Sequence, residues 1–367
     1  MLILVINPGS TSTKVAVYDR TAEIFSTAVD HDLRELSRFP RVSDQLQFRT
    51  QMISECLKER EALRGQRLSA VVGRGGLLHP LTGGVYAVNE AMKEDLRSAR
   101  YGSHASNLGA LIADRLAREL NIPAFVADPV VVDELDVLAR YTGLPEISRK
   151  SIFHALNQRA MAKKAAGDLG KPYTECTLIV AHLGGGTSVG IHVRGRVVDV
   201  NNALDGDGPF SIERAGRLPP GDWLRYAHSR GEDVGELQKR LTGRGGIVAH
   251  LGVNDARALE TAIDRHLQGL PDSGSLNGAK CLEVLNALCY QTAKEICSLA
   301  AVAEGRVDAV VLTGGLSHSE RVVREISRRV SFLAPVLVYP GENEMEALAS
   351  AAVEVLEKRA EVREYAS

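Results

Sequence analysis

The stretch from Leu2 to Lys14 reads L-I-L-V-I-N-P-G-S-T-S-T-K, and its pattern guides the interpretation of the whole chain. The apolar run at 2–6 predicts a strand, and two more strands are expected near Lys14–Asp19 and Glu23–Val29. Residues 7–14, at the first turn, carry four hydroxyls, one amide and one cation. Such a turn exposes N–H and O–H donors to a phosphate, so it predicts a phosphate-binding hairpin, with an ordinary polar hairpin as the alternative. It is not a P-loop, because it lacks G-x-x-x-x-G-K-[ST] and leads to a strand.

Length and composition exclude several classes of protein. The 367 residues correspond to roughly two domains. There are 44 Lys and Arg against 46 Asp and Glu, so no basic excess supports nucleic-acid binding as the main function. Five cysteines without a C-x-x-C pair argue against zinc or thioredoxin chemistry and fit a reducing compartment. The apolar run at 2–6 is too short for a signal peptide and no membrane span is found, so a cytoplasmic protein is expected.

The second half of the chain repeats the pattern of the first half. An apolar strand at Thr177–Leu183 is followed by three glycines and then by strands near Val189–Val193 and Arg196–Val200. The order strand, small-residue turn, strand, strand therefore occurs at 2–29 and again at 177–200. We interpret this as an internal duplication with an offset of about 175 residues.

The remaining pattern predicts an α/β chain with two domains and a boundary near Arg140–Arg149. The expected domains are residues 1–150 with the C-terminal segment 344–367, and residues 151–343. Further helices are expected at 44–61, 104–120, 278–304, 319–330 and 343–358, and further strands at 69–73, 123–128 and 307–312.

Two more glycine-rich turns follow apolar strands. The first is H-L-G-G-G-T-S at His182–Ser188, where three glycines are unfavourable unless the backbone needs a positive φ or contacts something closely. His182 could donate to a phosphoryl oxygen there, with a glycine hairpin and a surface histidine as the alternative. The second is T-G-G-L-S at Thr313–Ser317, at the carboxyl end of a strand, where α/β folds place ligands.

Together, the three turns resemble the two phosphate elements and the adenosine element of actin-like ATPases. Asn7–Lys14 is similar to the N-terminal signature of the acetate kinase family, and His182–Ser188 is similar to its second signature. The resemblance covers nearly the whole chain. It implies two duplicated actin-like (ribonuclease H-like) domains, with mixed sheets flanked by helices and the active site in the interdomain cleft. Further segments that fall in the family's order are Gly73–Gly76, Ala127–Asp133, Phe153-His154, Gly216-Arg217, Thr313–Ser319 and Asn343-Glu344.

The reaction that this resemblance implies moves the γ-phosphoryl group of ATP to a short carboxylate, reversibly, with Mg²⁺. A carboxylate has a pKa near 4–5 and is ionised at neutral pH, so no base is needed to create the nucleophile. The enzyme must instead suppress the repulsion between that anion and the γ-phosphate, by placement and electrostatics.

The resemblance also assigns roles to individual residues. Arg74 and Arg217 would clamp carboxylate and phosphoryl oxygens, although Arg217 could be an ordinary surface arginine. His154 and His182 would hydrogen-bond the transferring group, with a helix-start histidine as the alternative for His154. Asp128 would organise Mg²⁺ or its waters. Asn7 and Glu344 would complete the Mg²⁺ environment, an assignment that could slip to Glu342 or Glu346. The positions expected to bind the nucleotide are Ser10, Ser12, Lys14, Gly184, Gly185, Gly186, Gly314 and Gly315.

Departures from the acetate kinase pattern bear on the size of the acid. Gly76 falls where those enzymes carry valine, and Ser103 falls near a leucine; Phe153 and Pro209 resemble retained walls. The H-L-G-G-G stretch and the shorter chain also resemble the members that act on butyrate. Two extra methylenes are worth about 1.6 kcal/mol at roughly 0.8 kcal/mol each, so the pocket would prefer butyrate without excluding smaller acids. Gly76 could instead serve a backbone need at a positive φ.

Several alternatives remain open. A kinase of the same family for acetate, propionate or isobutyrate is the nearest one. A sugar or glycerol kinase would need Asp128 as a general base, and a non-metabolic actin-like ATPase is the most distant. The expected partners are a small carboxylic acid or acyl phosphate, with no nucleic acid and no membrane. The broad apolar surface of helix 278–304 and the resemblance predict a homo-oligomer, a dimer or a multiple of dimers.

Overall fold

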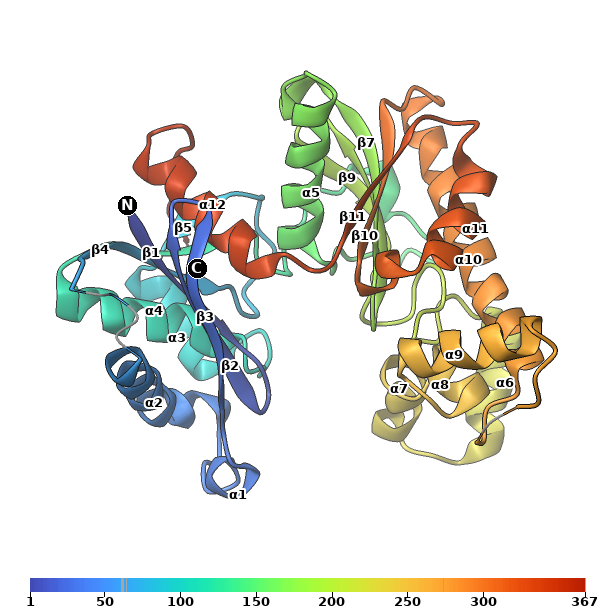
Figure 1. Ribbon diagram of the computed structural model, residues 1–367, viewed down its shortest axis with the longest axis horizontal. Coiled ribbons are helices and arrows are strands. Elements are labelled where there is room, and N and C mark those ends of the chain that lie inside the picture. The colour runs from blue at the N-terminus through green and yellow to red at the C-terminus, as the bar shows by residue number, and fades with distance from the viewer. Residues whose placement is uncertain (61–62, 64, 273, 367) are drawn as a thin grey trace. The chain divides into compact units, whose positions relative to one another are not determined.

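Two mixed β-sheets organise the chain (Figure 1). The computed structural model describes residues 1–60, 63, 65–272 and 274–366. Unit 1 contains Met1–Asp133, Ala155–Asn157 and Asn343–Ser367, and unit 2 contains Glu134–His154 and Gln158–Glu342. The first segment of unit 1 therefore ends at Asp133, earlier than the residue 150 expected from the sequence.

The sheet of unit 1 has the strand order β12-β5-β6-β4-β1-β2-β3. Strands β1, β2 and β3 form an antiparallel meander, while β1, β4 and β6 run parallel. All seven residues of β1 are buried, as expected for a central strand covered on both faces. The bounds are β1 Leu2–Pro8, β2 Ser12–Asp19, β3 Ala22–Asp30, β4 Leu68–Arg74, β5 Val85–Ala87, β6 Ala124–Ala127 and β12 Val362–Arg363.

Helices cover the sheet of unit 1. Helix α4 buries Leu108, Leu111, Ile112 and Leu116, four of the five residues of the apolar face predicted by its spacing. The fifth, Leu120, is the last residue of the helix and is exposed. The helix ends at Leu120 and is capped by Asn121, whose left-handed conformation (φ 53°) is typical of a helix C-terminus. The bounds are α1 Leu33–Leu36, α2 Leu46–Glu59, α3 Glu90–Ser98, α4 Asn107–Leu120 and α12 Glu344–Leu356, with a 3₁₀ turn at Val42–Gln45.

The sheet of unit 2 has the strand order β11-β10-β7-β8-β9. Strands β7, β8 and β9 form the antiparallel meander, and β10 and β11 extend it in parallel from β7. The bounds are β7 Thr177–Leu183, β8 Thr187–Val193, β9 Arg196–Val200, β10 Ala309–Gly314 and β11 Val336–Pro340.

Helices lie on both faces of this second sheet (Figure 1). Leu178 and Val180 pack with the apolar residues of α5, whereas Ile179 and Ala181 belong to the core that contains α10 and α11. This alternation follows from the two-residue period of a strand. The bounds are α5 Ala155–Asp168, α6 Pro220–Arg230, α7 Val234–Thr242, α8 Gly246–Leu251, α9 Ala256–Leu267, α10 Gly278–Ala300 and α11 Glu320–Val330.

The predicted duplication is confirmed by the topology. The order β3-β2-β1-β4-β6 in unit 1 corresponds to β9-β8-β7-β10-β11 in unit 2, with the same strand directions. The β1–β2 turn therefore corresponds to the triglycine turn between β7 and β8. The end of β4, which carries Arg74, corresponds to the end of β10 at Gly314.

Several elements differ from the prediction. Helices α1, α3 and α5–α9 and strands β5, β11 and β12 were not predicted. Most of them are short, but α9 has 12 residues and buries Leu259, Ala262 and Ile263 at helical spacing, so this helix was missed although its pattern was present. The helix expected at 44–61 begins with a 3₁₀ turn and ends at Glu59; residue 61 lies outside the described residues. The helix expected at 278–304 ends at Ala300, and its apolar residues Cys281, Leu285, Leu288 and Ile296 are buried in the core of unit 2. Packing within unit 2 therefore accounts for most of its apolar surface.

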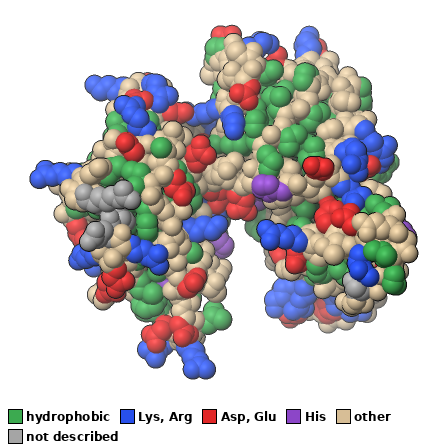
Figure 2. All heavy atoms as spheres, viewed as in Figure 1, with side chains coloured by type: hydrophobic (Ala, Val, Ile, Leu, Met, Phe, Trp, Pro, Cys, Tyr) green, Lys and Arg blue, Asp and Glu red, His purple; other side chains and the backbone are tan. Residues whose placement is uncertain are grey.

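The surface agrees with the balanced composition. Figure 2 shows basic and acidic side chains interspersed over the visible face of each unit. In the described part of the chain, no helix combines the length and apolarity that crossing a membrane requires. The five cysteines are all free thiols.

Candidate active site

Three of the predicted site residues lie at one edge of the unit 1 sheet. Asn7 is near the end of β1, Arg74 ends β4 and Asp128 follows β6. The parallel register pairs Ile6 with Gly73 and Arg74 with Ala127, so the carboxyl ends of the three strands are adjacent. This is the edge at which α/β folds bind ligands.

Glu344, the first residue of α12, reaches the same edge. Its Oε2 atom accepts hydrogen bonds from Asn7 Nδ2 at 2.8 Å and from the Arg74 guanidinium at 3.0 Å. The same Arg74 nitrogen lies 3.4 Å from Asn7 Oδ1. The Glu344 side chain is 13% exposed and that of Arg74 is 29% exposed, so the three side chains form a partly buried cluster.

The glycines around Arg74 are packed tightly. A Cβ atom at Gly73 would lie 2.2 Å from the carbonyl oxygen of Gly109 on α4, and one at Gly75 would lie 2.5 Å from Pro129 Cβ. Close backbone approach therefore explains the glycines and leaves Arg74 as the side chain presented at this strand end.

The same crowding applies to Gly76. A Cβ atom there would lie 2.6 Å from Asn107 Cα and 2.8 Å from Leu96 Cδ2, and its φ is not in the left-handed region. Asn107 also joins this segment to the loop of Ser103, because its Oδ1 accepts from Leu77 N–H and its Nδ2 donates to the Gly102 carbonyl. Ser103 itself is exposed. The structure therefore favours a backbone reason for Gly76, namely close approach rather than a positive φ, over an enlarged acyl pocket.

Asp128 has an unusual backbone conformation. Its φ is +38°, a region that residues other than glycine rarely adopt. Its Oδ1 accepts from Gly84 N–H at 2.7 Å, and its own N–H donates to the Gly84 carbonyl at 3.0 Å. These contacts hold the strained residue in place, and strain of this kind is frequent at functional sites.

The β1–β2 turn presents its hydroxyl residues as the strand period requires. Ser10 and Lys14 are exposed and Ser12 is half-buried, whereas Thr13 points inward and bonds His31 Nε2 at 2.8 Å. Gly9 N–H donates to the Ser12 carbonyl at 2.7 Å and closes the turn. The three predicted phosphate contacts are therefore accessible from solvent.

Arg49 on α2 supports this turn from behind and was not predicted. Arg49 is 1% exposed, and its guanidinium donates to the carbonyls of Gly9 at 2.8 Å and Ser10 at 2.9 Å. Burial lowers the pKa of Arg49 to about 10, so it remains a cation at neutral pH. It thus turns these carbonyl oxygens toward itself and places a positive charge beneath the turn.

In unit 2 the two predicted histidines are in direct contact. The rings of His154 and His182 stack with centroids 3.9 Å apart and an interplanar angle of 15°. His154 precedes α5, and His182 is a buried residue of β7. His154 Nδ1 lies 2.9 Å from the hydroxyl oxygen of Ser188 on β8.

The three glycines after β7 have neither of the usual structural explanations. None of Gly184, Gly185 and Gly186 has a φ in the left-handed region. The nearest atom to a Cβ would be at 3.3 Å for Gly184, 3.7 Å for Gly185 and 3.5 Å for Gly186, so side chains would be crowded at most mildly. Their carbonyls are partly anchored, since Gly185 O accepts from Ser211 Oγ and Glu213 N–H.

The two glycines after β10 differ from each other. Gly314 has a φ of +89°, and a Cβ there would lie 2.4 Å from the Leu183 carbonyl oxygen, so the fold requires glycine. Gly315 has no atom within 4 Å of a Cβ position and borders open space.

Arg217 is held by carboxylates of unit 2. Its guanidinium lies 3.2 Å from Asp207 and 3.4 Å from Glu295 on α10, while its N–H donates to the Gly208 carbonyl. Burial raises the pKa of Glu295, and the positive charge of Arg217 partly offsets this rise. Arg149 pairs with the same Asp207 at 3.5 Å.

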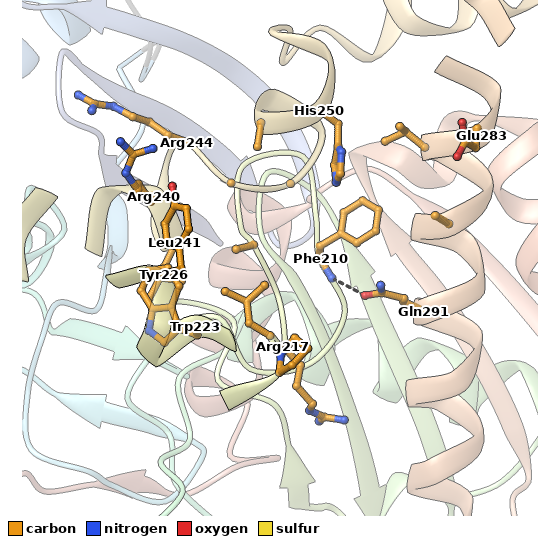
Figure 3. A pocket seen from close by; sticks show the side chains of 18 of the residues that line it. Phe210, Arg217, Trp223, Tyr226, Arg240, Leu241, Arg244, His250, Glu283 and Gln291 are labelled. Carbon is orange, nitrogen blue, oxygen red and sulfur yellow. Dashed lines mark hydrogen bonds between the residues drawn. The ribbon is translucent and has the colours of Figure 1, made fainter. Parts of the chain in front are cut away.

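A cavity of about 560 Å³ lies beside this loop, and Figure 3 shows it. Phe210 lines it, with its N–H donating to Gln291 Oε1, and the side chain of Arg217 leads away from His250 and Arg244. Arg217 is 63% exposed.

The two predicted wall residues, Phe153 and Pro209, are both buried in unit 2. Their segments are tied to the loop after β9, because Ala203 N–H donates to the Ile152 carbonyl and Asn201 Nδ2 donates to the Asp207 carbonyl.

Comparison with known proteins identifies the family of this chain. The sequence profile of the acetokinase family matches residues 145–352. The chain belongs to the acetokinase family. Butyrate kinase 1 of Clostridium acetobutylicum is 47% identical to this family member over 363 residues, which is 99% of each chain. Butyrate kinase 2 of the same organism is 46% identical, again over 99% of each chain.

Solved structures of the acetokinase family share the fold. An acetate kinase from Porphyromonas gingivalis matches with a TM-score of 0.76 and 18% identity, covering 97% of this chain and 99% of that one. A propionate kinase from Francisella tularensis matches with a TM-score of 0.73 and 17% identity, covering 95% and 98%. The predicted duplicated α/β fold is thereby confirmed.

Proposed function

We propose that this acetokinase-family chain transfers the γ-phosphoryl group of ATP to the carboxylate of a short-chain fatty acid, with butyrate preferred, giving an acyl phosphate and ADP reversibly. The observation that carries the proposal is the 47% identity, over 99% of both chains, to Butyrate kinase 1 of Clostridium acetobutylicum.

The chemistry suits the side chains. The acid is already ionised near neutral pH, so no residue has to remove a proton from it. Two anions must approach each other, and Arg74 and Arg217 are the cations proposed to hold them, with His154 and His182 as further donors to the transferring group. Arg74 belongs to unit 1, and Arg217, His154 and His182 belong to unit 2.

ATP is proposed to bind the β1–β2 turn and the β7–β8 turn, which occupy corresponding positions in the two sheets. Gly184–Gly186 carry no strain or tight packing that would demand glycine, which supports close approach of a phosphate to their backbone. Ser10, Ser12 and Lys14 would contact phosphates above the buried Arg49 cation. Gly315, which borders open space, would lie near the adenine.

Mg²⁺ is proposed to accompany ATP. This ion prefers oxygen ligands and is commonly held by one or two carboxylates together with waters and phosphates. The Asn7 amide oxygen and the Glu344 carboxylate both lie beside the Arg74 guanidinium. No group of three His, Cys, Asp or Glu that could hold a metal ion is found among the described residues. Asn7 and Glu344 fit an Mg²⁺ ion that is held mainly by the phosphates of ATP. The bound ion would neutralise part of the phosphate charge. Asp128 would orient the waters bound to the ion.

The preference for butyrate is proposed from the relatives. The crowding around Gly76 weighs against its use as an argument for a larger pocket. Ser103 remains a proposed position that enlarges the pocket, and Phe153 and Pro209 remain proposed walls. We also propose a homo-oligomer, a dimer or a multiple of dimers, which light scattering at micromolar concentration would contradict by giving the 39.6 kDa mass of one chain.

A hydroxamate trap tests the proposed reaction. The chain is incubated with ATP, Mg²⁺, hydroxylamine and each acid from C2 to C6. We expect acyl hydroxamate from the panel with the highest kcat/KM for butyrate. If the chain phosphorylated hydroxyl groups instead, no acyl hydroxamate would form with any acid. If kcat/KM were highest for acetate, the proposed reaction would stand and the proposed preference for butyrate would be wrong.

A further inference from the structure

A chain of buried polar side chains leads to His154. Tyr173 Oη lies 2.8 Å from His192 Nδ1, and His192 Nε2 lies 3.1 Å from Gln158 Oε1. Gln158 Nε2 lies 2.9 Å from both the carbonyl and the hydroxyl oxygen of Ser188, and that hydroxyl lies 2.9 Å from His154 Nδ1. Gln158, Ser188 and His192 are fully buried.

The fold places these residues together on one side of the unit 2 sheet. Ser188 and His192 are four residues apart on β8, so they share a face, and His154 and Gln158 are four residues apart at the start of α5. Gly190 lies between the two β8 residues, and a Cβ there would lie 2.8 Å from Gln158 Oε1. The glycine therefore makes room for the amide of Gln158.

The hydrogen atoms in this chain follow from a count of donors and acceptors. The Ser188 carbonyl can only accept, which orients the Gln158 amide with Nε2 toward Ser188 and Oε1 toward His192. His192 consequently donates from Nε2 and accepts from Tyr173 at Nδ1. It is a neutral imidazole, because burial, with a smaller contribution from the Arg159 charge, lowers its pKa to about 3.

The same count applies at Ser188. Its hydroxyl oxygen accepts from Gln158 Nε2 at 2.9 Å and from the His154 backbone N–H at 3.5 Å. Both lone pairs are then engaged, and the single hydroxyl hydrogen points to His154 Nδ1. A neutral His154 that accepts at Nδ1 carries its hydrogen on Nε2.

We propose that Gln158 and His192 are positioning residues that hold His154 in the Nε2–H tautomer, so that it presents a donor rather than a lone pair to the phosphoryl group. This inference rests on the proposed function of His154. A donor stabilises negative charge that builds on the transferring group, whereas a lone pair would repel it. His192 acts through Gln158, and Gln158 acts through Ser188.

The tautomer can be measured without activity. Ring ¹⁵N signals of histidine-labelled full-length protein, assigned with His154→Gln, are recorded at neutral pH without substrates. We expect His154 as the Nε2–H form in the wild type. In Gln158→Glu the carboxylate cannot donate to Ser188, so the hydroxyl turns toward it and His154 shifts toward Nδ1–H. His31, which bonds Thr13 in unit 1, is the internal control and keeps its signals. A wild-type His154 in the Nδ1–H form overturns the proposal.

Kinetics separate this role from a structural one. We expect Gln158→Glu to lower kcat for acyl phosphate formation about tenfold or more, with smaller changes in the KM values. In a His154→Ala background the same substitution should lower kcat little further, because both substitutions remove the same interaction with the phosphoryl group. Gln158→Met removes the hydrogen bond from Gln158 to Ser188 without adding a charge, so His154 is no longer held in one tautomer. This variant replaces Gln158→Glu in the test if Gln158→Glu does not fold. If the losses of kcat in the two single variants add in the double variant, Gln158 does not act through His154 and the positioning role is wrong. Normal activity of His154→Ala would instead contradict the proposed function of His154, while the ¹⁵N result stands separately.

Discussion

Arg74 and Glu344 lie 270 positions apart in the chain and meet in an ion pair of 3.0 Å. The pair joins the end of β4 to the first turn of α12, and Asn7 bonds to both partners. It places one cation and one carboxylate at the edge of the sheet where the three parallel strands end. The predictions below begin from this pair.

Arg74→Ala is expected to lower kcat/KM for butyrate at least about 100-fold, roughly 2.7 kcal/mol, because one of the two cations proposed to hold the approaching anions would be lost. The control is Arg20→Ala, which removes a different ion pair of unit 1, that of Arg20 with Glu357 directly after α12. Steady-state kinetics and thermal unfolding of both variants make the test. Near-normal kinetics of folded Arg74→Ala would remove this arginine from the site.

Arg217→Ala should lower kcat/KM by a similar factor and also reduce stability, because it leaves the buried Glu295 carboxylate with less compensation. The double variant Arg217→Ala/Glu295→Gln should recover the melting temperature and not the activity. If activity returned with stability, Arg217 would have a structural role alone.

Arg49→Met should raise the KM for ATP about tenfold, with a smaller effect on the KM for butyrate, because the carbonyls of Gly9 and Ser10 lose their donor and the turn loses its buried cation. Arg49→Lys should recover only part of this effect, since one ammonium cannot reproduce the planar fork. The exposed Arg38→Met is the control. Equal changes in both KM values would argue for a general loss of structure.

Gly76→Val should reduce kcat/KM for acetate, propionate and butyrate alike and lower the melting temperature, because the side chain would meet Asn107 and Leu96. Overpacking of this kind costs roughly 1–3 kcal/mol. Gly76→Ala should show the same pattern more weakly. A selective loss of butyrate activity at unchanged stability would restore Gly76 as part of an acyl pocket.

Stability should fall as the pH drops from about 6.5 to about 4. Burial, and secondly the Arg49 charge, lower the pKa of His31 from 6.5 to about 4. The unfolded chain therefore binds a proton in this window that the folded chain does not bind, worth about 3 kcal/mol at the lower end. In urea unfolding, His31→Gln should flatten the pH dependence by about one proton, whereas the exposed His228→Gln should not. Identical slopes in wild type and His31→Gln would contradict the assignment.

The sequence alone determined the duplicated strand meanders, the turns at 7–14 and 182–188, and the helices at 104–120 and 319–330. These features depend on short-range periods and on turn residues, which are written in neighbouring positions. It also predicted Arg74, Asn7 and Glu344 as site residues, through resemblance, and the structure brings their three side chains into contact.

Only the tertiary structure decided what surrounds these residues. Arg49 appears in the sequence as one more helical cation, and Glu295 and Gln158 as polar interruptions in their helices. Their roles depend on segments that approach from far along the chain, so no local pattern distinguishes them from solvated side chains. The same reason explains Gly76, because the sequence shows that a side chain is missing and only the packing of Asn107 shows that the space is filled.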